Sequence, residues 1–342
     1  MPFRHPLLNY RAGSPALFLC SRDRPESSLL YRGDMHHVAI RTPAKFAVPA
    51  LLVANIALAI GPWLVRIARA EGQVGPIGSG FWRLALAVPF LLIVARRERH
   101  EAPLVDRKSA IVAALVSGLF FAADLASWHV GILHTRLANA TLFGNVTAIL
   151  LPLYGFLVLR ALPTRKQGLA LALAAIGGAL LIGRSYELAA RNLVGDLLCL
   201  FAGICYTGYL AAADRARALL GPWTTLTLSV LASLPVLLGA ALVMQDPIWP
   251  RVWWPLLLMT LGSQITGQGL ILYAVNRVSS MVIGLMLLVQ PIVAAAIGWI
   301  IYGEALTLFD FLGAFGIAAA LLLVRDSSRP LPRDKIGLSS VA

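Results

Sequence analysis

The chain has 342 residues, of which 58% are hydrophobic and only 13% are charged, and its mean hydropathy is +0.77. An ordinary soluble domain carries about 25% charged residues, so this chain cannot cover a water-exposed surface and is expected to lie in lipid. The formal net charge of +13 would suggest nucleic-acid binding in a soluble protein. Here the basic residues stand between apolar runs, which is typical of membrane proteins, and no nucleic-acid partner is expected.

The first 45 residues differ from the rest of the chain. They are mostly polar and rich in Arg, and their apolar patch at residues 16–20 is too short for the core of a signal peptide. Met35 stands shortly before the first apolar run, so we expect the natural chain to start there. Residues 1–34 would then be disordered or an extension that is not native, and 1–45 would form a cytoplasmic segment.

Ten apolar runs follow, and most approach the roughly 20 residues that a helix needs to cross the hydrocarbon core. The connections between them are short, and some contain the helix breakers Gly75-Pro76 and Gly221-Pro222. The sequence therefore predicts an all-α, polytopic integral membrane protein of about ten transmembrane helices. The ten runs are 46–65, 78–95, 109–133, 137–159, 167–183, 193–213, 222–244, 253–275, 278–302 and 306–324.

Lys and Arg residues predict the orientation of these spans. If residues 1–45 are cytoplasmic, the connections on the cytoplasmic side and the tail at 326–342 hold many more Lys and Arg residues than the connections on the other side. An excess of positive charge marks the cytoplasmic side of a membrane protein. We therefore expect a multi-pass protein of the cell membrane with both termini in the cytoplasm.

The chain resembles a tandem repeat of two halves, 46–184 and 193–325. The fourth run opens with Arg136-Leu-Ala-Asn-Ala and the ninth with Arg277-Val-Ser-Ser-Met. Five spans per half is an odd number, so the second half starts from the opposite side of the membrane. Such inverted repeats place a solute site near the midplane, where the halves meet, and work by alternating access.

Three stretches are similar to segments of the EamA-type permeases of the drug/metabolite transporter superfamily. They are Phe81-Trp-Arg-Leu-Ala-Leu-Ala-Val-Pro-Phe, Arg136-Leu-Ala-Asn-Ala-Thr-Leu and Gly303-Glu-Ala-Leu-Thr-Leu-Phe-Asp-Phe-Leu-Gly313. The resemblance covers about residues 46–325. It implies a ten-helix secondary transporter of the bacterial inner membrane with inverted repeats, often an exporter of metabolites or drugs. One departure is that the first half has Arg160-Ala-Leu-Pro where the second has Gly303-Glu304, so no role that needs a carboxylate in both halves is expected.

Two charged residues lie deep in their runs. Ionisable groups inside a bilayer are costly and are candidate functional residues for that reason. Arg83 and Asp124 each lie about 5 Å from the midpoint of a run, at 1.5 Å per residue, and on the same side of the midplane. We predict a buried pair. It is either a structural ion pair, or two residues that each face water, or a protonation or solute-amine site at Asp124 tuned by Arg83. Asp196 and Asp310 lie near the ends of runs, where helix N-termini favour negative charge.

Further polar and aromatic residues stand near the centres of runs. Phe120, Asp124 and Trp128 share one helical stripe, because steps of four residues stay on one face, and aromatic rings beside an acid favour a bound ammonium group. His129 is expected on another face near the outer end of the span, with no proton-relay role. The remaining candidates would form a hydrogen-bonding cavity or hold helices together: Asn55, Asn145, Tyr206, Gln264, Gln268 and Gln290. Pro152 and Pro291 interrupt corresponding runs of the two halves, which indicates a binding region.

No metal-binding or cofactor motif is present. The three cysteines lack paired ligand spacing, and neither His-Glu-x-x-His nor a Gly-rich phosphate loop occurs. The leading hypothesis is therefore a secondary transporter of a small-molecule solute, with protons as a candidate coupling ion, rather than an enzyme. An integral membrane enzyme and a non-transporting membrane sensor remain the alternatives, and a homodimer is one assembly that the sequence leaves open.

The proton hypothesis makes a testable prediction. Asp124→Asn is expected to abolish or reshape the pH dependence of transport without affecting membrane insertion, because the amide has no proton to exchange. Transport measured over a pH series, with the protein quantified in the membrane fraction, tests this. A variant that is inserted and keeps the wild-type pH dependence would contradict a protonation role for Asp124.

Overall fold

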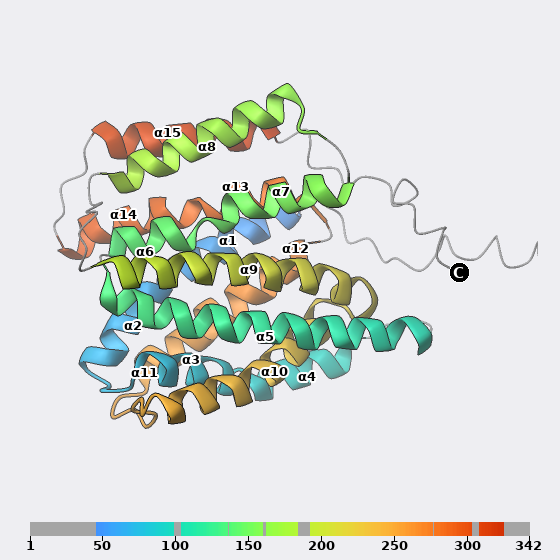
Figure 1. Ribbon diagram of the computed structural model, residues 1–342, viewed down its shortest axis with the longest axis vertical. Coiled ribbons are helices and arrows are strands. Elements are labelled where there is room, and N and C mark those ends of the chain that lie inside the picture. The colour runs from blue at the N-terminus through green and yellow to red at the C-terminus, as the bar shows by residue number, and fades with distance from the viewer. Residues whose placement is uncertain are drawn as a thin grey trace, which may run out of the picture. The chain divides into compact units, whose positions relative to one another are not determined.

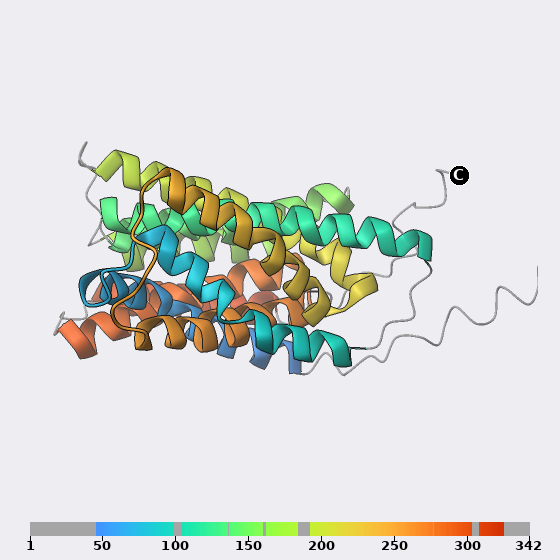
Figure 2. The same cartoon turned by 90° about the horizontal axis from the view of Figure 1, so that it is seen from below.

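The computed structural model describes residues 46–98, 104–135, 137–159, 162–183, 192–275, 277–302 and 308–324. Within these ranges every regular element is a helix, and the helices run roughly along a common direction (Figures 1 and 2). The expectations for residues 1–45, for Gly303-Glu304 and for the C-terminal tail fall outside the described residues and stay predictions.

Several of the expected spans are divided into two helices by a break. The first half of the chain contains α1 (Ala47–Ala59), α2 (Gly61–Ala70), α3 (Pro76–Ala85), α4 (Val88–Arg97), α5 (Leu104–His134), α6 (Leu137–Gly144), α7 (Thr147–Leu159) and α8 (Arg165–Gly183). The second half contains α9 (Leu193–Leu220), α10 (Pro222–Val243), α11 (Trp254–Leu258), the π-helix η5 (Met259–Gln268), α12 (Gly269–Ala274), α13 (Ser280–Leu287), α14 (Val289–Tyr302) and α15 (Leu308–Val324).

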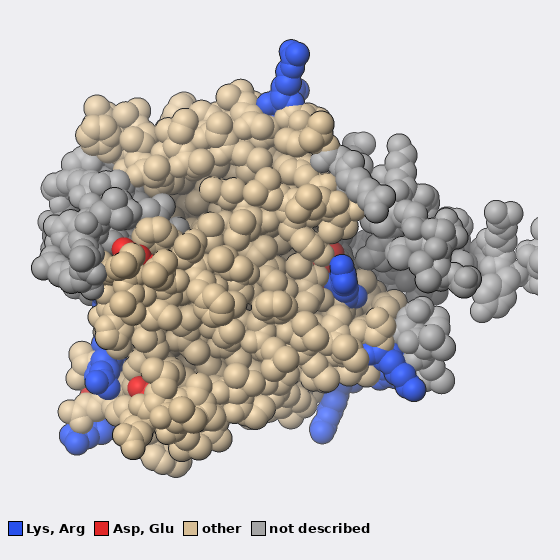
Figure 3. Space-filling model, viewed as in Figure 1, with Lys and Arg blue, Asp and Glu red and all other residues tan. Residues whose placement is uncertain are grey.

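Six helical stretches are long and apolar enough to cross a membrane: Ala47–Ala70, Pro76–Arg97, Arg107–His134, Leu193–Leu220, Pro222–Val243 and Trp254–Ala274. Three shorter apolar helices, Thr147–Val158, Ser280–Val293 and Phe311–Leu323, fall in the fourth, ninth and tenth expected spans. On the face in Figure 3, Lys and Arg side chains lie near the ends of the helices, and the band between them is uncharged. An all-α, polytopic membrane protein is thus confirmed, while the count of ten spans stays a prediction.

Helices from the two halves of the chain pack against each other. α8 packs along α15 and α7 along α13, so the fifth expected span contacts the tenth and the fourth contacts the ninth (Figure 1). α10, the seventh span, packs along α3 and α4, which form the second. Each of these contacts joins spans at equivalent positions of the repeat. The two halves, as far as the structure describes them, therefore interleave within one compact unit.

Two carboxylates connect α10 to the α3–α4 pair at opposite ends. At one end Asp246, just after α10, accepts a hydrogen bond through Oδ2 from the N–H of Gly78 in the first turn of α3, at 2.8 Å. At the other end Glu98, just after α4, accepts hydrogen bonds from the N–H groups of Thr224 (2.7 Å) and Trp223 (3.3 Å) in the first turn of α10. Such N–H groups have no partner within their own helix, so each span supplies a cap for the other.

This reciprocal capping requires α10 to run antiparallel to α3 and α4, as equivalent spans of inverted repeats do. Both capped helices begin at the proline of a Gly-Pro pair. At Gly75 a Cβ atom would lie 1.9 Å from Asp246 Oδ1, so only glycine allows this approach. Gly221 adopts a φ of 81°, which glycine tolerates without steric cost. We call the two ends of the bundle the Asp246 end and the Glu98 end.

The Asp246 cap has a measurable effect on stability. Asp246→Ala is expected to lower the free energy of unfolding by about 1 kcal/mol, because the N-terminus of α3 loses its acceptor. Asp246→Asn should cost less, because the amide oxygen can still accept the hydrogen bond. Thermal denaturation in detergent measures both variants, with Glu71→Ala as an exposed acidic control at the same end. Equal losses for the alanine and asparagine variants would contradict the capping role.

Asp246 also predicts a pH dependence. Burial raises the pKa of the Asp246 carboxyl, although the N–H groups of Gly78 and Ile77 and the charge of Arg69 act in the opposite direction. A raised pKa means that the folded protein binds this proton more tightly than the unfolded chain, so this contribution to the free energy of unfolding increases as the pH falls through the raised pKa. Denaturation over a pH series should show this component in the wild type but not in Asp246→Asn.

Candidate functional site

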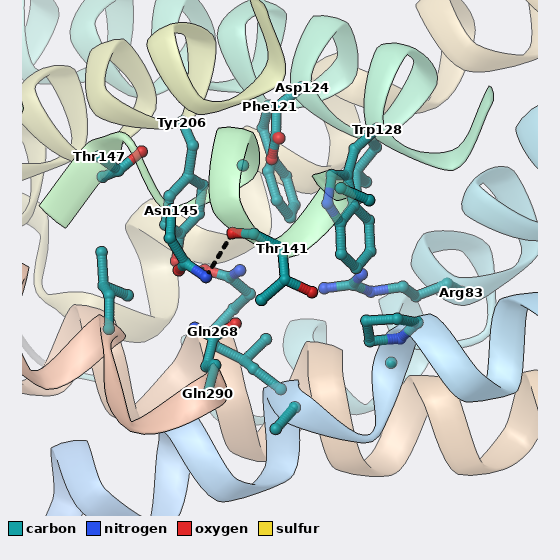
Figure 4. A pocket seen from close by; sticks show the side chains of 18 residues that line it. Arg83, Phe121, Asp124, Trp128, Thr141, Asn145, Thr147, Tyr206, Gln268 and Gln290 are labelled. Atoms are coloured by element: carbon teal, nitrogen blue, oxygen red, sulfur yellow. Dashed lines mark hydrogen bonds between the residues drawn. The ribbon is translucent and has the colours of Figure 1, made fainter. Parts of the chain in front are cut away.

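A cavity of about 90 Å³ lies inside the bundle and is lined by residues from both halves of the chain. One water molecule needs only about 10–15 Å³ on this measure, so the cavity has room for a small organic solute. Figure 4 shows the side chains around it. Apolar, aromatic, hydroxyl and amide groups all contribute to the lining, together with two charges of opposite sign.

The cavity lies where broken spans meet. A π-helix or an interrupted helix in a membrane span often marks a functional site. The unbroken helices α5 and α9 complete the wall, whereas α8, α10 and α15 contribute no lining residue within the described part of the chain. Each broken or irregular span supplies residues at or near its irregularity: Gly61-Pro62 at the α1–α2 break, Arg83 before the α3–α4 break, Gly144-Asn145 at the α6–α7 break, Gln268 at the end of η5, and Leu287 and Gln290 on either side of the α13–α14 break.

Arg83 and Asp124 both reach this cavity but do not bind each other. Arg83 is only 3% exposed and points toward Thr141 of α6, whereas Asp124 lies beside Phe121 on α5 (Figure 4). Across the described residues, no ion pair or hydrogen bond joins the two side chains, and Arg83 Nε is buried without a hydrogen-bond partner. The predicted direct pair is therefore wrong, because the guanidinium extends along the cavity wall toward α6. The two charges still act on each other electrostatically.

The amide and phenol groups of the lining form hydrogen bonds within and between the two halves. The Tyr206 hydroxyl of α9 donates a hydrogen bond to Gln268 Oε1, at 3.4 Å. Gln290 Nε2 of α14 donates to Asn55 Oδ1 of α1, at 2.9 Å. Asn145 Nδ2 donates to the carbonyl oxygen of Thr141 at 2.8 Å, across the α6–α7 break (Figure 4). These bonds fix the lining residues in place.

The structure brings most of the sequence-predicted site residues to this one cavity. Asn55 is not in the lining and lies behind it, bonded to Gln290. Gln264 is fully buried, and within the described residues its amide has no hydrogen-bond partner. It lies one turn closer to the Asp246 end than Gln268, so it does not reach the cavity. The predicted residues in the lining are Arg83, Asp124, Trp128, Asn145, Tyr206, Gln268 and Gln290.

One expectation for α5 needs correction. Phe121, not Phe120, lines the cavity, because Phe120 is 41% exposed and lies on the other side of the helix, against Gly208. The stripe that faces inward is therefore Phe121, Asp124, Leu125 and Trp128, a spacing that the sequence itself contains. His129 lies off that stripe and beside the first turn of α3, near the end of the span as expected, and it is fully buried.

His129 contacts the beginning of α3. Its Nδ1 lies 3.1 Å from Ser79 Oγ and 2.9 Å from the carbonyl oxygen of Pro76, so the ring holds α3 against α5. Asp196 is buried in the first turn of α9, where Thr135 Oγ1 donates a hydrogen bond to it at 2.6 Å. The side chain of Asp310 falls outside the described residues. Neither His129 nor Asp196 lines the cavity.

Sequence reasoning missed the threonines of the lining, Thr141 and Thr147. The Thr147 hydroxyl donates to the carbonyl oxygen of Gly203 at 2.6 Å and so joins α7 to α9. Pro291, expected to mark a break, stands in the first turn of α14 directly after one. Pro152 stands inside α7 instead, and its ring lies where a Cβ at Gly284 would clash. Both threonines stand close to the Gly144-Asn145 break, and this position is the signal in the sequence that could have identified them as lining residues.

Comparisons with known proteins agree with this architecture. The model of the EamA-like transporter family matches residues 45–183 and 193–325. The threonine/homoserine exporter RhtA of Escherichia coli K12 is 30% identical over 162 residues, which are 46% of this chain and 55% of that protein. RhtA of Salmonella typhimurium SL1344 is 30% identical over 149 residues, or 43% of this chain and 50% of that protein. The chain thus matches about half the length of these relatives.

A protein of known crystal structure shares the fold. It aligns with a TM-score of 0.64 and 13% sequence identity, over 83% of this chain and 97% of that protein. At this level of identity the likeness concerns the arrangement of the helices alone.

Gly144 offers a test of the cavity. A Cβ at this position would lie 3.1 Å from Trp128 Nε1, so Gly144→Val is expected to push the indole into the cavity and to reduce transport several-fold. Gly239→Val is the matched control, because Gly239 is exposed on α10 with no neighbouring atom within 4 Å of the added Cβ. Transport normalised to the amount of membrane-inserted protein measures both. Equal activity in the two variants would place the working site elsewhere.

Proposed function

Because the chain belongs to the EamA-like transporter family, we propose that it exports a small polar solute across the bacterial inner membrane by alternating access. The observation that supports this best is the cavity, where breaks in spans of both halves meet and bring two charges to one place. Inverted-repeat transporters place their solute sites near the midplane at such discontinuous helices. The names of the threonine/homoserine exporters support export as the direction.

The same contacts support a view of which parts move. α10 and the α3–α4 pair are joined at both ends, by Asp246 and by Glu98, so they behave as one rigid piece. Alternating access then requires bending elsewhere, at breaks such as Asn145-Val146 and Leu288. Breaks of this kind absorb backbone changes in hinge motions. In this arrangement the Glu98 end faces the cytoplasm together with both termini, as the Lys and Arg bias predicts.

Proton coupling belongs to the same proposal. Asp124 is the one acidic side chain among the described lining residues, and a carboxyl group inside a membrane span is the usual carrier of a coupling proton. A proton and the solute would then occupy Asp124 alternately during the transport cycle. A homodimer remains compatible with this scheme, in which each chain contains a complete cavity.

A flux assay tests the proposed function. Purified protein in liposomes, loaded with labelled amino acids, nucleosides or cationic drugs, is expected to release at least one of these solutes faster than protein-free liposomes do. An imposed pH gradient should change that rate if protons are the coupling ion. Gly144→Val protein is the control with reduced flux, and Gly239→Val protein is the control with unchanged flux.

The outcome separates the alternatives. If no solute of the panel crosses in either direction, with or without a pH gradient, the transport proposal fails in favour of a membrane enzyme or a sensor. Chemical change of a solute without its movement would indicate the enzyme. Labelling of single cysteines at the Asp246 and Glu98 ends from the two sides of intact cells tests the orientation.

A further inference from the structure

The two charges of the cavity are not neutralised by each other. Arg83 and Asp124 are the charged residues among its described lining. Arg83 is buried and its Nε atom has no hydrogen-bond partner, whereas Asp124 is only partly buried. No ion pair joins them within the described part of the chain. A charge in a medium of low dielectric constant is costly to keep without a partner. An occupant that pairs with both groups offsets this cost for the buried Arg83 and supplies a partner to Asp124.

The signs of the charges restrict what the occupant is. A simple anion would be attracted by Arg83 but repelled by Asp124, and a simple cation would be attracted by Asp124 but repelled by Arg83. A neutral solute would leave both groups unpaired. A molecule that carries a carboxylate and an ammonium group on neighbouring atoms can pair with both residues. This requires that Arg83 and Asp124 do not already bind each other, and the structure shows that they do not.

Resting on the proposed transport function, we propose that the cavity binds a small zwitterionic amino acid, with its carboxylate on Arg83 and its ammonium group on Asp124. The planar guanidinium presents parallel N–H donors that match a carboxylate. On the other side, Trp128 lies one turn after Asp124 on α5, and Tyr206 of α9 also borders the cavity. Aromatic rings within reach of a cation add attraction.

The rest of the lining indicates the kind of side chain. Thr141, Asn145, Gln268 and Gln290 provide hydroxyl and amide groups, which favour a hydroxyl-bearing or other small polar side chain. Leu58 and Leu287, which stand next to two of the breaks, add apolar surface. Both of these leucines line the cavity. A volume of about 90 Å³ disfavours large aromatic amino acids.

Binding to purified protein tests the charge assignment directly. The probes are L-threonine, its methyl ester, which keeps only the ammonium group, and N-acetyl-L-threonine, which keeps only the carboxylate. Isothermal titration calorimetry in detergent is expected to give binding about tenfold or more weaker for the ester and for the N-acetyl compound than for L-threonine. If either derivative binds as tightly as the amino acid, the zwitterion proposal is overturned.

Two variants assign each charge to its partner. In Arg83→Gln the preference for L-threonine over its methyl ester should disappear, while the preference over N-acetyl-L-threonine remains. In Asp124→Asn the preference for L-threonine over N-acetyl-L-threonine should disappear, while the preference over the methyl ester remains. A merely structural role would weaken all three probes alike, so that pattern, or a variant that keeps the wild-type preferences, overturns the assignment.

The controls use charges outside the cavity. Arg66→Gln and Glu71→Gln change exposed residues of the same signs and should leave all three affinities unchanged. Circular dichroism and size-exclusion chromatography confirm that each variant is folded. If Arg83→Gln does not fold, Arg83→Lys serves instead, since it keeps the charge but loses the two-pronged geometry and should reduce the preference over the ester.

The outcomes distinguish this proposal from the proposed function. Flux of nucleosides or cationic drugs, without binding of any amino acid, would sustain transport and reject the zwitterion. Binding of L-threonine without flux would sustain the zwitterion proposal and reject transport. A further binding experiment replaces the α-amino acid by β-alanine and by γ-aminobutyrate, in which the ammonium and carboxylate groups are farther apart. Binding is expected to weaken as this separation increases. Equal binding at all spacings would contradict simultaneous contact with Arg83 and Asp124.

Discussion

The hydrocarbon core of a bilayer offers no water to a backbone N–H or C=O group, so each must find its partner within the chain. Most of this protein meets the constraint with α-helices, yet five of its expected spans contain a break or a π-helical stretch. Such irregular backbone is tolerated only inside the protein or beside a polar cavity. The irregularities here meet at one cavity, where side chains such as Asn145 bond to the backbone across the break. The constraint therefore decides where a solute site can be.

The ends of the spans answer the same constraint in another way. The first N–H groups of α3 and α10 receive carboxylates from the opposite span, Asp246 for α3 and Glu98 for α10. One set of bonds thus satisfies two helix ends and fixes the antiparallel pairing of equivalent spans. It also limits motion, because a pair joined at both ends cannot open at either end without losing a cap. Conformational change is then left to the broken spans around the cavity.

Buried charge adds specificity to this framework. Arg83 lies in the last turn of α3, a helix whose position depends on the Asp246 cap and on the buried ring of His129. Asp124 lies on the unbroken α5. The distance between the two charges is therefore set by contacts outside the cavity, and it keeps them apart enough that they do not bind each other. A buried pair would have been satisfied without a solute, whereas two separated charges favour an occupant that carries both signs.

The sequence by itself determined the membrane class, the two repeats, the family and the positions of most helices. The helix of 137–159 begins and ends at the expected residues although it contains a break, because the length of an apolar run and its flanking charges follow directly from the thickness of the hydrocarbon core. Periodicity also separated His129 from the face of Asp124. These properties depend on local composition, which a single sequence contains in full.

Only the tertiary structure decided which polar residues share a cavity. Gln264 and Gln268 stand one turn apart and look equivalent in the sequence, yet only Gln268 lines the cavity. Phe120 and Phe121 are neighbours, and the rotation of α5 against α9 selects the second. Arg83 and Asp124 have matching depths but do not pair. The physical reason is that the depth, rotation and breaks of each helix are set by its packing against helices far away in the sequence, and by caps such as Asp246, which no local pattern records.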